Sequence, residues 1–323
     1  MSRYQGIYAT LLDQYIDFKR NLGYKFVDAE STYYLFDQFT MQNDETEIGI
    51  TKELADRWAV KRPNESDSTC YRRVMYLIQF ASFLNDSGYK SYIPKLPGAY
   101  KSTFTPYIFS NKEMANIFAA SNRLKMDNLM DSTVNTIPAI LRMMYGTGIR
   151  VGEAVSLKVK DVNLDDRYLV IRQSKNGKER MVPFSDSLAE VCKQYRNSLH
   201  IIQNPEDYFF VKRNGYKCRA KTIYEWFRKV LQEAEIPHGG KGQGPRLHDL
   251  RFAFSVHSLA AMAKSGLDLY YSLPILSEYL GHQSLEATDK YVRLASDMYP
   301  ELLSNINNIC SYAFPEVKCH ETD

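Results

Sequence analysis

A proline-containing stretch at residues 92–109 interrupts the hydrophobic patterning of this chain. It has prolines at positions 94, 97 and 106 and almost no helical or strand periodicity. Because proline lacks a backbone N–H and fixes its φ angle, such a stretch does not continue a regular element and is typical of a linker. We therefore predict two domains, residues 1–96 and 109–294, joined by a linker at residues 97–108 and followed by a tail at residues 295–323.

The first domain shows four amphipathic helical patterns. The first stripe ends near Gly23 and consists of Tyr8, Leu11, Leu12, Tyr15 and Leu22. Two further helices are expected behind Ser31 and Thr51. The fourth stripe consists of Tyr71, Val74, Leu77, Ile78, Ala81 and Leu84. Arg72 and Arg73 lie off this stripe and are expected to face outward. Four short helices in about 90 residues predict a small helical domain.

The second domain is expected to be mainly helical with one small sheet. The Ser110 to Glu113 spacing matches a capping box, so a helix begins there. Two strand-like runs, residues 168–173 and 180–184, flank Lys175-Asn176-Gly177-Lys178, and Asn-Gly supplies the positive φ angles of a tight hairpin turn. A strand is expected at residues 208–211, and helices at residues 186–199, at 222–234, around 247–251 and on both sides of Gly281-His282. The predicted fold class is mainly α with a small β-hairpin, an α+β arrangement.

Composition narrows the class of protein without naming a function. Hydrophobic residues make up 44% and charged residues 24%, which fits a soluble globular protein. No apolar run approaches the roughly 18 residues that a membrane helix needs, and the N-terminus has no signal-peptide core, so we expect a cytoplasmic protein. The five cysteines are scattered without a C-x-x-C pair, which supports neither a disulfide framework nor a zinc site. A net charge of +3 permits nucleic-acid binding but does not argue for it.

Four separated segments hold the residues that could carry chemistry. They are residues 147–153 with Arg150 and Glu153, the hairpin with Lys175, residues 247–251 with His248 and Arg251, and residues 281–291 with His282 and Tyr291. Cleavage of a phosphodiester without a metal needs arginines on the non-bridging oxygens, because a guanidinium donates two parallel hydrogen bonds and stays charged. A tyrosine can attack in line, a lysine near DNA can protonate the leaving oxygen, and histidines can move protons or hold a phosphate oxygen. The set is chemically complete for phosphoryl transfer to tyrosine.

Each residue also has a plainer structural interpretation when taken alone. Arg150, with a glutamate three residues later, fits a solvated helix pair. His282 after a glycine can cap a helix, and Tyr291 is one of 24 tyrosines, a residue type that mostly packs in cores and at their rims. The hairpin lysines can be solubilising loop charges, and we assign His257 a structural role. The residues alone leave both interpretations open.

Taken in order, the four segments closely resemble the catalytic domain of the tyrosine recombinase (phage integrase) family. The signature of that family is an arginine in T-G-x-R-x-x-E, a lysine on a β-hairpin, H-x-x-R, and L-G-H with a tyrosine nine residues after the histidine. The matching segments here are Thr147-Gly148-Ile149-Arg150-Val151-Gly152-Glu153, Lys175, His248-Asp249-Leu250-Arg251, Leu280-Gly281-His282 and Tyr291. Residues 1–96 look like the family's SAM-like core-binding domain, and the resemblance implies that the two domains form a C-shaped clamp on DNA.

The resemblance implies a role for each catalytic position. Tyr291 would attack the scissile phosphate to give a 3′-phosphotyrosine and a free 5′-hydroxyl. Arg150 and Arg251 would stabilise the pentacovalent transition state, and Lys175 would protonate the leaving oxygen. Because the phosphotyrosine keeps the bond energy, neither ATP nor any other cofactor is implied, and no metal is implied either.

The remaining positions are implied to assist. His248 would help proton transfer, His282 would hydrogen-bond the phosphate, and Glu153 would orient its neighbours. Further phosphate contacts, which would fix position more than sequence, are expected from Lys61, Arg62, Arg72, Arg73 and Lys178. Ordinary surface charge is the alternative interpretation of these five residues.

The resemblance also implies partners. They are a double-stranded DNA recombination site, three further copies of the chain, and an accessory or directionality factor. The four copies would form a synaptic homotetramer in which strand exchange proceeds through a Holliday junction. Free in solution the chain would be a monomer. The tail at residues 295–323 would dock on a neighbouring subunit, with packing in cis as the alternative.

The stretch between Arg251 and His282 is several residues longer than is usual, and Phe252-Ala253-Phe254 stands where basic and hydroxyl residues are commoner. The longer stretch resembles recombinases of transposons and other mobile elements, so we expect integration, excision or resolution of such an element.

Two other functions compete with this interpretation. A type IB topoisomerase or a telomere resolvase would share the active-site set, and release of a cut strand would mark the topoisomerase. A DNA-binding accessory protein with a dead active site is the other candidate, although no catalytic position is missing.

Overall fold

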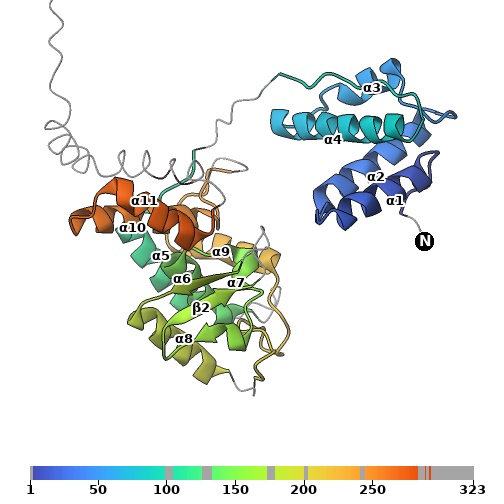
Figure 1. Cartoon of the computed structure of the whole chain (residues 1–323). Helices are drawn as coiled ribbons and strands as arrows, with labels where there is room; N and C mark the ends of the chain where they lie inside the picture. Colours follow the sequence, from blue (N-terminus) through green and yellow to red (C-terminus); the bar gives the residue numbers. More distant parts are fainter. Residues whose placement is uncertain are drawn as a thin grey trace, which may run out of the picture. The chain divides into compact units, whose positions relative to one another are not determined.

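The computed structural model describes residues 3–98, 105–125, 133–172, 179–199, 203–240 and 244–282, together with Thr288 and Tyr291. The chain divides into two compact units, Met1–Phe104 and Thr105–Asp323 (Figure 1). None of the described helices is both long enough and apolar enough to cross a membrane.

The first unit is a bundle of four helices. They are α1 (Ala9–Asn21), α2 (Val27–Gln42), α3 (Lys52–Ala59) and α4 (Asp67–Asp86). Thr51 and Ser66 cap α3 and α4, because each hydroxyl accepts a hydrogen bond from a backbone N–H of the first turn. Helix α4 packs against each of the other three helices around an aromatic core that includes Tyr15, Phe36 and Phe80. Burial of these rings contributes to the hydrophobic stabilisation of the unit.

The four predicted helices of this unit are present, with three corrections. Helix α2 begins at Val27 rather than behind Ser31, and its acidic residues Asp28 and Glu30 fall in the first turn, where they complement the helix dipole. Leu22 is 57% exposed because the helix ends at Asn21 and the apolar stripe ends with it. The prediction that Arg73 faces outward is wrong, since it is only 4% exposed.

The second unit is a helical bundle with one small sheet. Its helices are α5 (Asn111–Arg123), α6 (Ile137–Thr147), α7 (Val151–Ala154), α8 (Asp186–Ser198), α9 (Ala220–Glu233), α10 (Asp249–Lys264) and α11 (Leu269–Leu280), with two 3-10 turns, η1 (Val134–Thr136) and η2 (Val159–Asp161). The three antiparallel strands are β1 (Val162–Asn163), β2 (Tyr168–Ile171) and β3 (Arg180–Pro183), in the order β1-β2-β3. The register pairs Tyr168 with Pro183 and Ile171 with Arg180.

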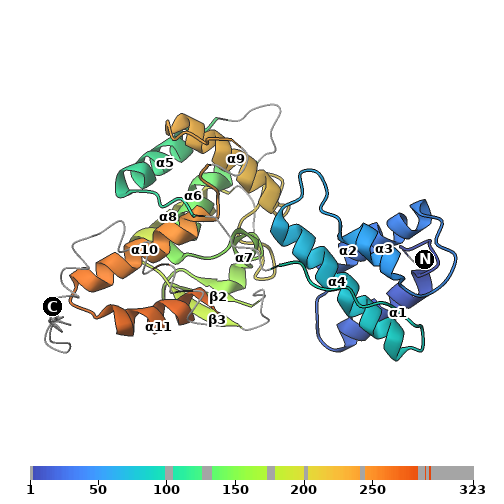
Figure 2. The same ribbon diagram turned by 90° about the horizontal axis from the view of Figure 1, so that it is seen from above.

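Helix α6 lies at the centre of this unit. It contacts α5, α8, α9 and α10, and α10 in turn packs beside α11 (Figure 2). Apolar residues cover most of its circumference, so it is buried on nearly all sides. The end of α6 is therefore a rigid point from which neighbouring residues are positioned.

The predicted α+β class is confirmed. The capping box at Ser110 and Glu113 is present, and the two strands of the predicted hairpin pair as expected. The turn with Lys175 and Lys178, and the tail at residues 295–323, lie outside the described residues. Residues 208–211 are not a strand, because only isolated bridges form there, from Tyr208 to Lys158 and from Val211 to Lys217.

Candidate active site

Arg251 lies at the centre of the predicted catalytic residues. It is carried by the first turn of α10 and is 1% exposed. Its Nη1 donates to the carbonyl oxygen of Gly148 at 2.6 Å, and its Nη2 donates to the carbonyl oxygen of Leu280 at 2.8 Å. The same Nη2 lies 3.0 Å from Nε2 of His282. Two distant turns of the chain are thus held together by one guanidinium.

His282 and Tyr291 stand on one side of this arginine. Gly281 ends α11 with a φ angle of 66°, a value that favours glycine, and this turn directs the chain into His282. The imidazole Nδ1 lies 2.8 Å from the hydroxyl of Thr288. The ring of Tyr291 stacks on that of His282 with centroids 5.8 Å apart and 13° between the planes, and Tyr291 is 1% exposed.

Arg150 brings a second guanidinium near Arg251. Helix α6 ends at Thr147, and the next residue, Gly148, has a φ angle of 62° that reverses the chain toward α7. Arg150 is the residue before α7, and both its backbone N–H, at 2.9 Å, and its Nη1, at 3.0 Å, donate to the carboxylate of Glu153. Glu153 therefore contacts both the backbone and the guanidinium of Arg150, and the orienting role that the resemblance implies for it stays a prediction.

Arg180 is a member of this cluster that the sequence analysis did not identify. It lies on β3, where its Nη2 and Nη1 donate to Glu153 at 2.8 and 3.2 Å, and its Nε donates to the carbonyl oxygen of Tyr279 at 3.2 Å. Its side chain is only 8% exposed. The alternation of side chains along a strand could have predicted an inward arginine, but the strand sequence says nothing of which carboxylate it meets.

The electrostatics of the cluster favour an anion. Three guanidinium groups, those of Arg150, Arg180 and Arg251, gather around one carboxylate, that of Glu153, so two positive charges are in excess among them. Burial, together with the nearby charge of Arg150, lowers the pKa of Arg251 to about 10, so it stays protonated at neutral pH. Burial alone would raise the pKa of Glu153, but hydrogen bonds from Arg180 and from the Arg150 backbone outweigh it and hold this pKa below its usual range.

His248 is placed at the edge of this cluster. It precedes α10, and its ring meets that of Phe252 edge-on at 5.5 Å. Phe252 in turn meets the ring of Tyr291 at 5.3 Å. The structure therefore brings Arg150, Arg251, His282, Tyr291 and Glu153 into one cluster with His248 beside it, whereas Lys175 lies outside the described residues.

His257 has the structural role that we assigned to it. Its Nδ1 lies 2.8 Å from the hydroxyl of Tyr145, at the contact between α10 and α6. Burial lowers the pKa of this histidine, which favours the neutral ring in this packed position.

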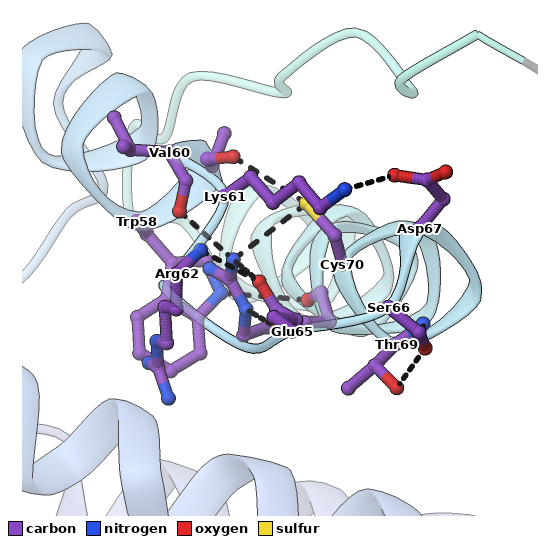
Figure 3. A network of polar contacts seen from close by, with 11 residues as sticks. Trp58, Val60, Lys61, Arg62, Glu65, Ser66, Asp67, Thr69 and Cys70 are labelled. Atoms are coloured by element: carbon purple, nitrogen blue, oxygen red, sulfur yellow. Dashed lines mark hydrogen bonds and ion pairs between the residues drawn. The ribbon is translucent and has the colours of Figure 1, made fainter. Parts of the chain in front are cut away.

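The basic residues predicted in the first unit differ from one another (Figure 3). The guanidinium of Arg73 forms a fork-like pair with Glu65 at 2.9 and 2.8 Å, so it is an internal ion pair and not a candidate phosphate contact. Arg62 lies over the ring of Trp58 at 4.8 Å, and Lys61 pairs with Asp67 at 2.5 Å on the surface. Arg72 is exposed, and Lys178 lies outside the described residues.

Comparison with known proteins identifies relatives over most of the chain. The model of the phage integrase family matches residues 108–298. A Sinorhizobium fredii protein described as "Putative integrase/recombinase y4rB" is 29% identical over 305 residues, which cover 91% of this chain and 95% of that protein. The tyrosine recombinase XerD of Oceanobacillus iheyensis is 27% identical over 285 residues, which cover 83% of this chain and 87% of that protein.

Solved structures with the same fold include two assemblies of lambda integrase. A dimer of its residues 75–356 bound to a COC′ core site aligns with a TM-score of 0.63 and 16% identity, over 87% of this chain and 94% of that one. A tetramer bound to a Holliday junction aligns with a TM-score of 0.59 and 17% identity, over 85% of this chain and 77% of that one. At this level of identity the alignments establish the fold.

Proposed function

This chain belongs to the phage integrase family and is a tyrosine site-specific recombinase, and we propose that it cleaves and rejoins DNA through a 3′-phosphotyrosine link to Tyr291. The observation that carries this proposal is the stack of Tyr291 on His282, whose Nε2 lies 3.0 Å from the buried guanidinium of Arg251. A tyrosine held against a histidine beside uncompensated positive charge has what attack on a phosphate diester requires.

The chemical step follows from these groups. The phenol oxygen of Tyr291 forms a bond to phosphorus, the bond from phosphorus to the 5′ oxygen breaks, and Arg150 and Arg251 hold the non-bridging oxygens as negative charge develops. The phenol proton leaves with the help of His248, and Lys175 protonates the departing 5′ oxygen. Rejoining is the reverse attack by a 5′-hydroxyl, so neither ATP nor a metal enters the cycle.

Tyr291 must become exposed before this step. Tyr291 is 1% exposed in the DNA-free chain, and its ring packs against those of His282 and Phe252. A hidden nucleophile does not cut DNA outside an assembled complex, so we infer that DNA binding moves Tyr291 toward the phosphate.

We extend the proposal to the biological assembly. The two units would form a C-shaped clamp on a double-stranded recombination site, and four copies would exchange strands through a Holliday junction, as the lambda integrase tetramer supports. The tail at residues 295–323 would dock on a neighbouring copy, and an accessory or directionality factor would set the outcome. Integration, excision or resolution of a mobile element, in the cytoplasm and at the nucleoid, is the proposed role.

A nicked suicide substrate made from the ends of the genetic element tests the chemistry. The protein and the substrate are mixed with EDTA, and a DNA-linked protein species is sought on a denaturing gel. We expect the species with wild type and none with Tyr291→Phe. Tyr279→Phe is the matched control, because this half-buried phenol donates to the carbonyl oxygen of Pro183 at 2.7 Å and should not react.

Four results would contradict the proposal. An adduct that persists in Tyr291→Phe would assign the nucleophile to another residue. An adduct that is lost in EDTA would require a metal, and tight binding with no adduct at several candidate sites would favour the accessory-protein alternative. Relaxation of supercoiled DNA without strand exchange would favour the topoisomerase alternative.

A further inference from the structure

We propose that Arg180 is a positioning residue for DNA cleavage, and that it acts by neutralising Glu153 so that the charge of Arg150 remains available to the phosphate. This inference rests on the proposed function. It starts from geometry, because Arg180 gives Glu153 two hydrogen bonds, at 2.8 and 3.2 Å, while Arg150 gives the same carboxylate one from its guanidinium, at 3.0 Å.

The charges explain why a second arginine is needed. The carboxylate of Glu153 has a side-chain exposure of 4%, so water screens it little. If Arg150 were its sole cation, that pair would be close to neutral and the guanidinium would be drawn toward the carboxylate. Arg180 satisfies the carboxylate instead, and the Arg150 side chain, at 28% exposure, keeps an open face. A substrate phosphate can then bind the Arg150 guanidinium, which is oriented by Glu153 but keeps its positive charge.

The surroundings of Arg180 show that its position is fixed from three sides. Its Nε donates to the carbonyl oxygen of Tyr279 on α11, and its backbone belongs to β3 of the hairpin. A Cβ atom added at Gly281 would lie 2.9 Å from its Cδ and 3.0 Å from its Nη1, so glycine leaves just enough room for the side chain. Arg180 therefore joins Glu153 and the hairpin to the turn that precedes His282.

The main test is the rate of covalent cleavage in a single turnover at saturating DNA. We expect Arg180→Gln to cleave roughly 10- to 100-fold more slowly than wild type, as misplacement of a group at an active site does, while its affinity for DNA stays within about twofold. Arg167→Gln is the matched control, because Arg167 is an exposed arginine on the same hairpin that pairs with Asp186, away from the cluster. Wild-type rate in Arg180→Gln would overturn the inference.

A double variant separates positioning from loss of folding. Arg180→Gln leaves the carboxylate of Glu153 to Arg150 alone, whereas Arg180→Gln with Glu153→Gln removes that carboxylate. We therefore expect the double variant to cleave faster than Arg180→Gln. Equal or slower cleavage by the double variant would overturn the inference, because a purely structural role predicts that the two losses add.

A sulfur-substituted substrate identifies the group that Arg180 serves. Sulfur in place of the bridging 5′ oxygen gives a leaving group that needs no proton donor. If Arg180 acts through Arg150, the defect of Arg180→Gln persists on this substrate; if sulfur restores the rate, Arg180 acts through the hairpin lysine Lys175 and the inference is wrong. Failure of wild type to form any adduct would instead contradict the proposed function, so the two failures are distinguishable.

Discussion

Arg73 in the first unit and Arg251 in the second are both almost fully buried, at 4% and 1% exposure, but their guanidinium groups meet opposite surroundings. Arg73 is matched by a carboxylate, that of Glu65, whose side chain is itself only 7% exposed. Arg251 donates to the carbonyl oxygens of Gly148 and Leu280, and it forms no ion pair with a carboxylate in the described part of the chain. The two residues are equally hidden but differ in counter-charge.

This difference in counter-charge separates an arginine that stabilises the fold from an arginine that can bind an anion. A buried arginine with a carboxylate is close to neutral, and its removal leaves an unpaired charge in the core. A buried arginine held by carbonyl dipoles keeps its full charge and gains most when an anion arrives. Burial alone therefore does not identify a functional arginine. The group that its guanidinium contacts, a carboxylate or a main-chain carbonyl, is what distinguishes the two kinds.

The largest expected effect is on the stability of the first unit. Arg73→Met should lower its free energy of unfolding by about 3–5 kcal/mol, because Glu65 is left buried and unpaired. The fluorescence of Trp58, which lies 5.0 Å from the Arg73 guanidinium, reports the transition when Trp226 is replaced by phenylalanine. Arg72→Met, at the exposed neighbouring position, is the control. A loss below about 1 kcal/mol would remove the distinction between the two buried arginines.

The second effect is on the reaction. Arg251→Met should slow single-turnover cleavage by about 10²–10³-fold, or roughly 3–4 kcal/mol, as the loss of a charge-stabilising donor does. Its free energy of unfolding should fall less than that of Arg73→Met, because no carboxylate loses its partner. Chemical denaturation and adduct formation on the same samples check both parts. Cleavage within tenfold of wild type would show that the charge of Arg251 is dispensable.

The third effect concerns acid. Hydrogen bonds from Arg73 hold the pKa of Glu65 below its usual range, so the charged form stabilises the folded state. This stability is complete above the unfolded pKa of about 4.3 and is lost as the pH falls through the lower folded pKa. Glu65→Gln should therefore flatten the decline of stability below about pH 5, as followed by urea unfolding at several pH values. An unchanged slope would mean that this pair does not contribute to acid sensitivity.

The smallest effect should come from Lys61, in the same network as Arg73. The side chains of Lys61 and Asp67 are 53% and 69% exposed, so solvent screens this pair and it contributes little to folding. If Lys61 contacts a phosphate, Lys61→Met should weaken DNA binding equally for all sequences and reduce the salt dependence by about one contact. Filter binding at several salt concentrations measures this, and an unchanged salt slope would reduce Lys61 to an ordinary surface charge.

Sequence patterns predicted the elements that depend on local chemistry. The capping box at Ser110 and the two paired strands of the hairpin follow from residues close together in the chain. The contacts that depend on distant residues were not predictable in this way. Arg73 lies off the apolar stripe of α4, yet Glu65 in the preceding loop draws it into the core. Arg180 meets a carboxylate 27 positions earlier in the chain, which no local pattern indicates.

The sequence predicted which residues belong to the candidate site but not which atoms contact one another. The order and spacing of Arg150, His248, Arg251, His282 and Tyr291 resemble one family, and the structure places these residues close together. Which atoms hold Arg251 could not be predicted, because main-chain carbonyl groups carry no signature in a sequence.

Those carbonyl anchors bear on how the protein can change over generations. A substitution alters a side chain, but every residue retains its main-chain oxygen, so no single codon change at Gly148 or Leu280 deletes an anchor of Arg251. Only displacement of the backbone can break it, and a Cβ at Gly148 would do so by lying 2.4 Å from the ring of Phe254. Most substitutions therefore leave the hydrogen bonds of the Arg251 guanidinium intact, whereas a substitution at Gly148 would disrupt them. Variants selected for new DNA targets can therefore diversify the surrounding side chains while inheriting this anchor unchanged.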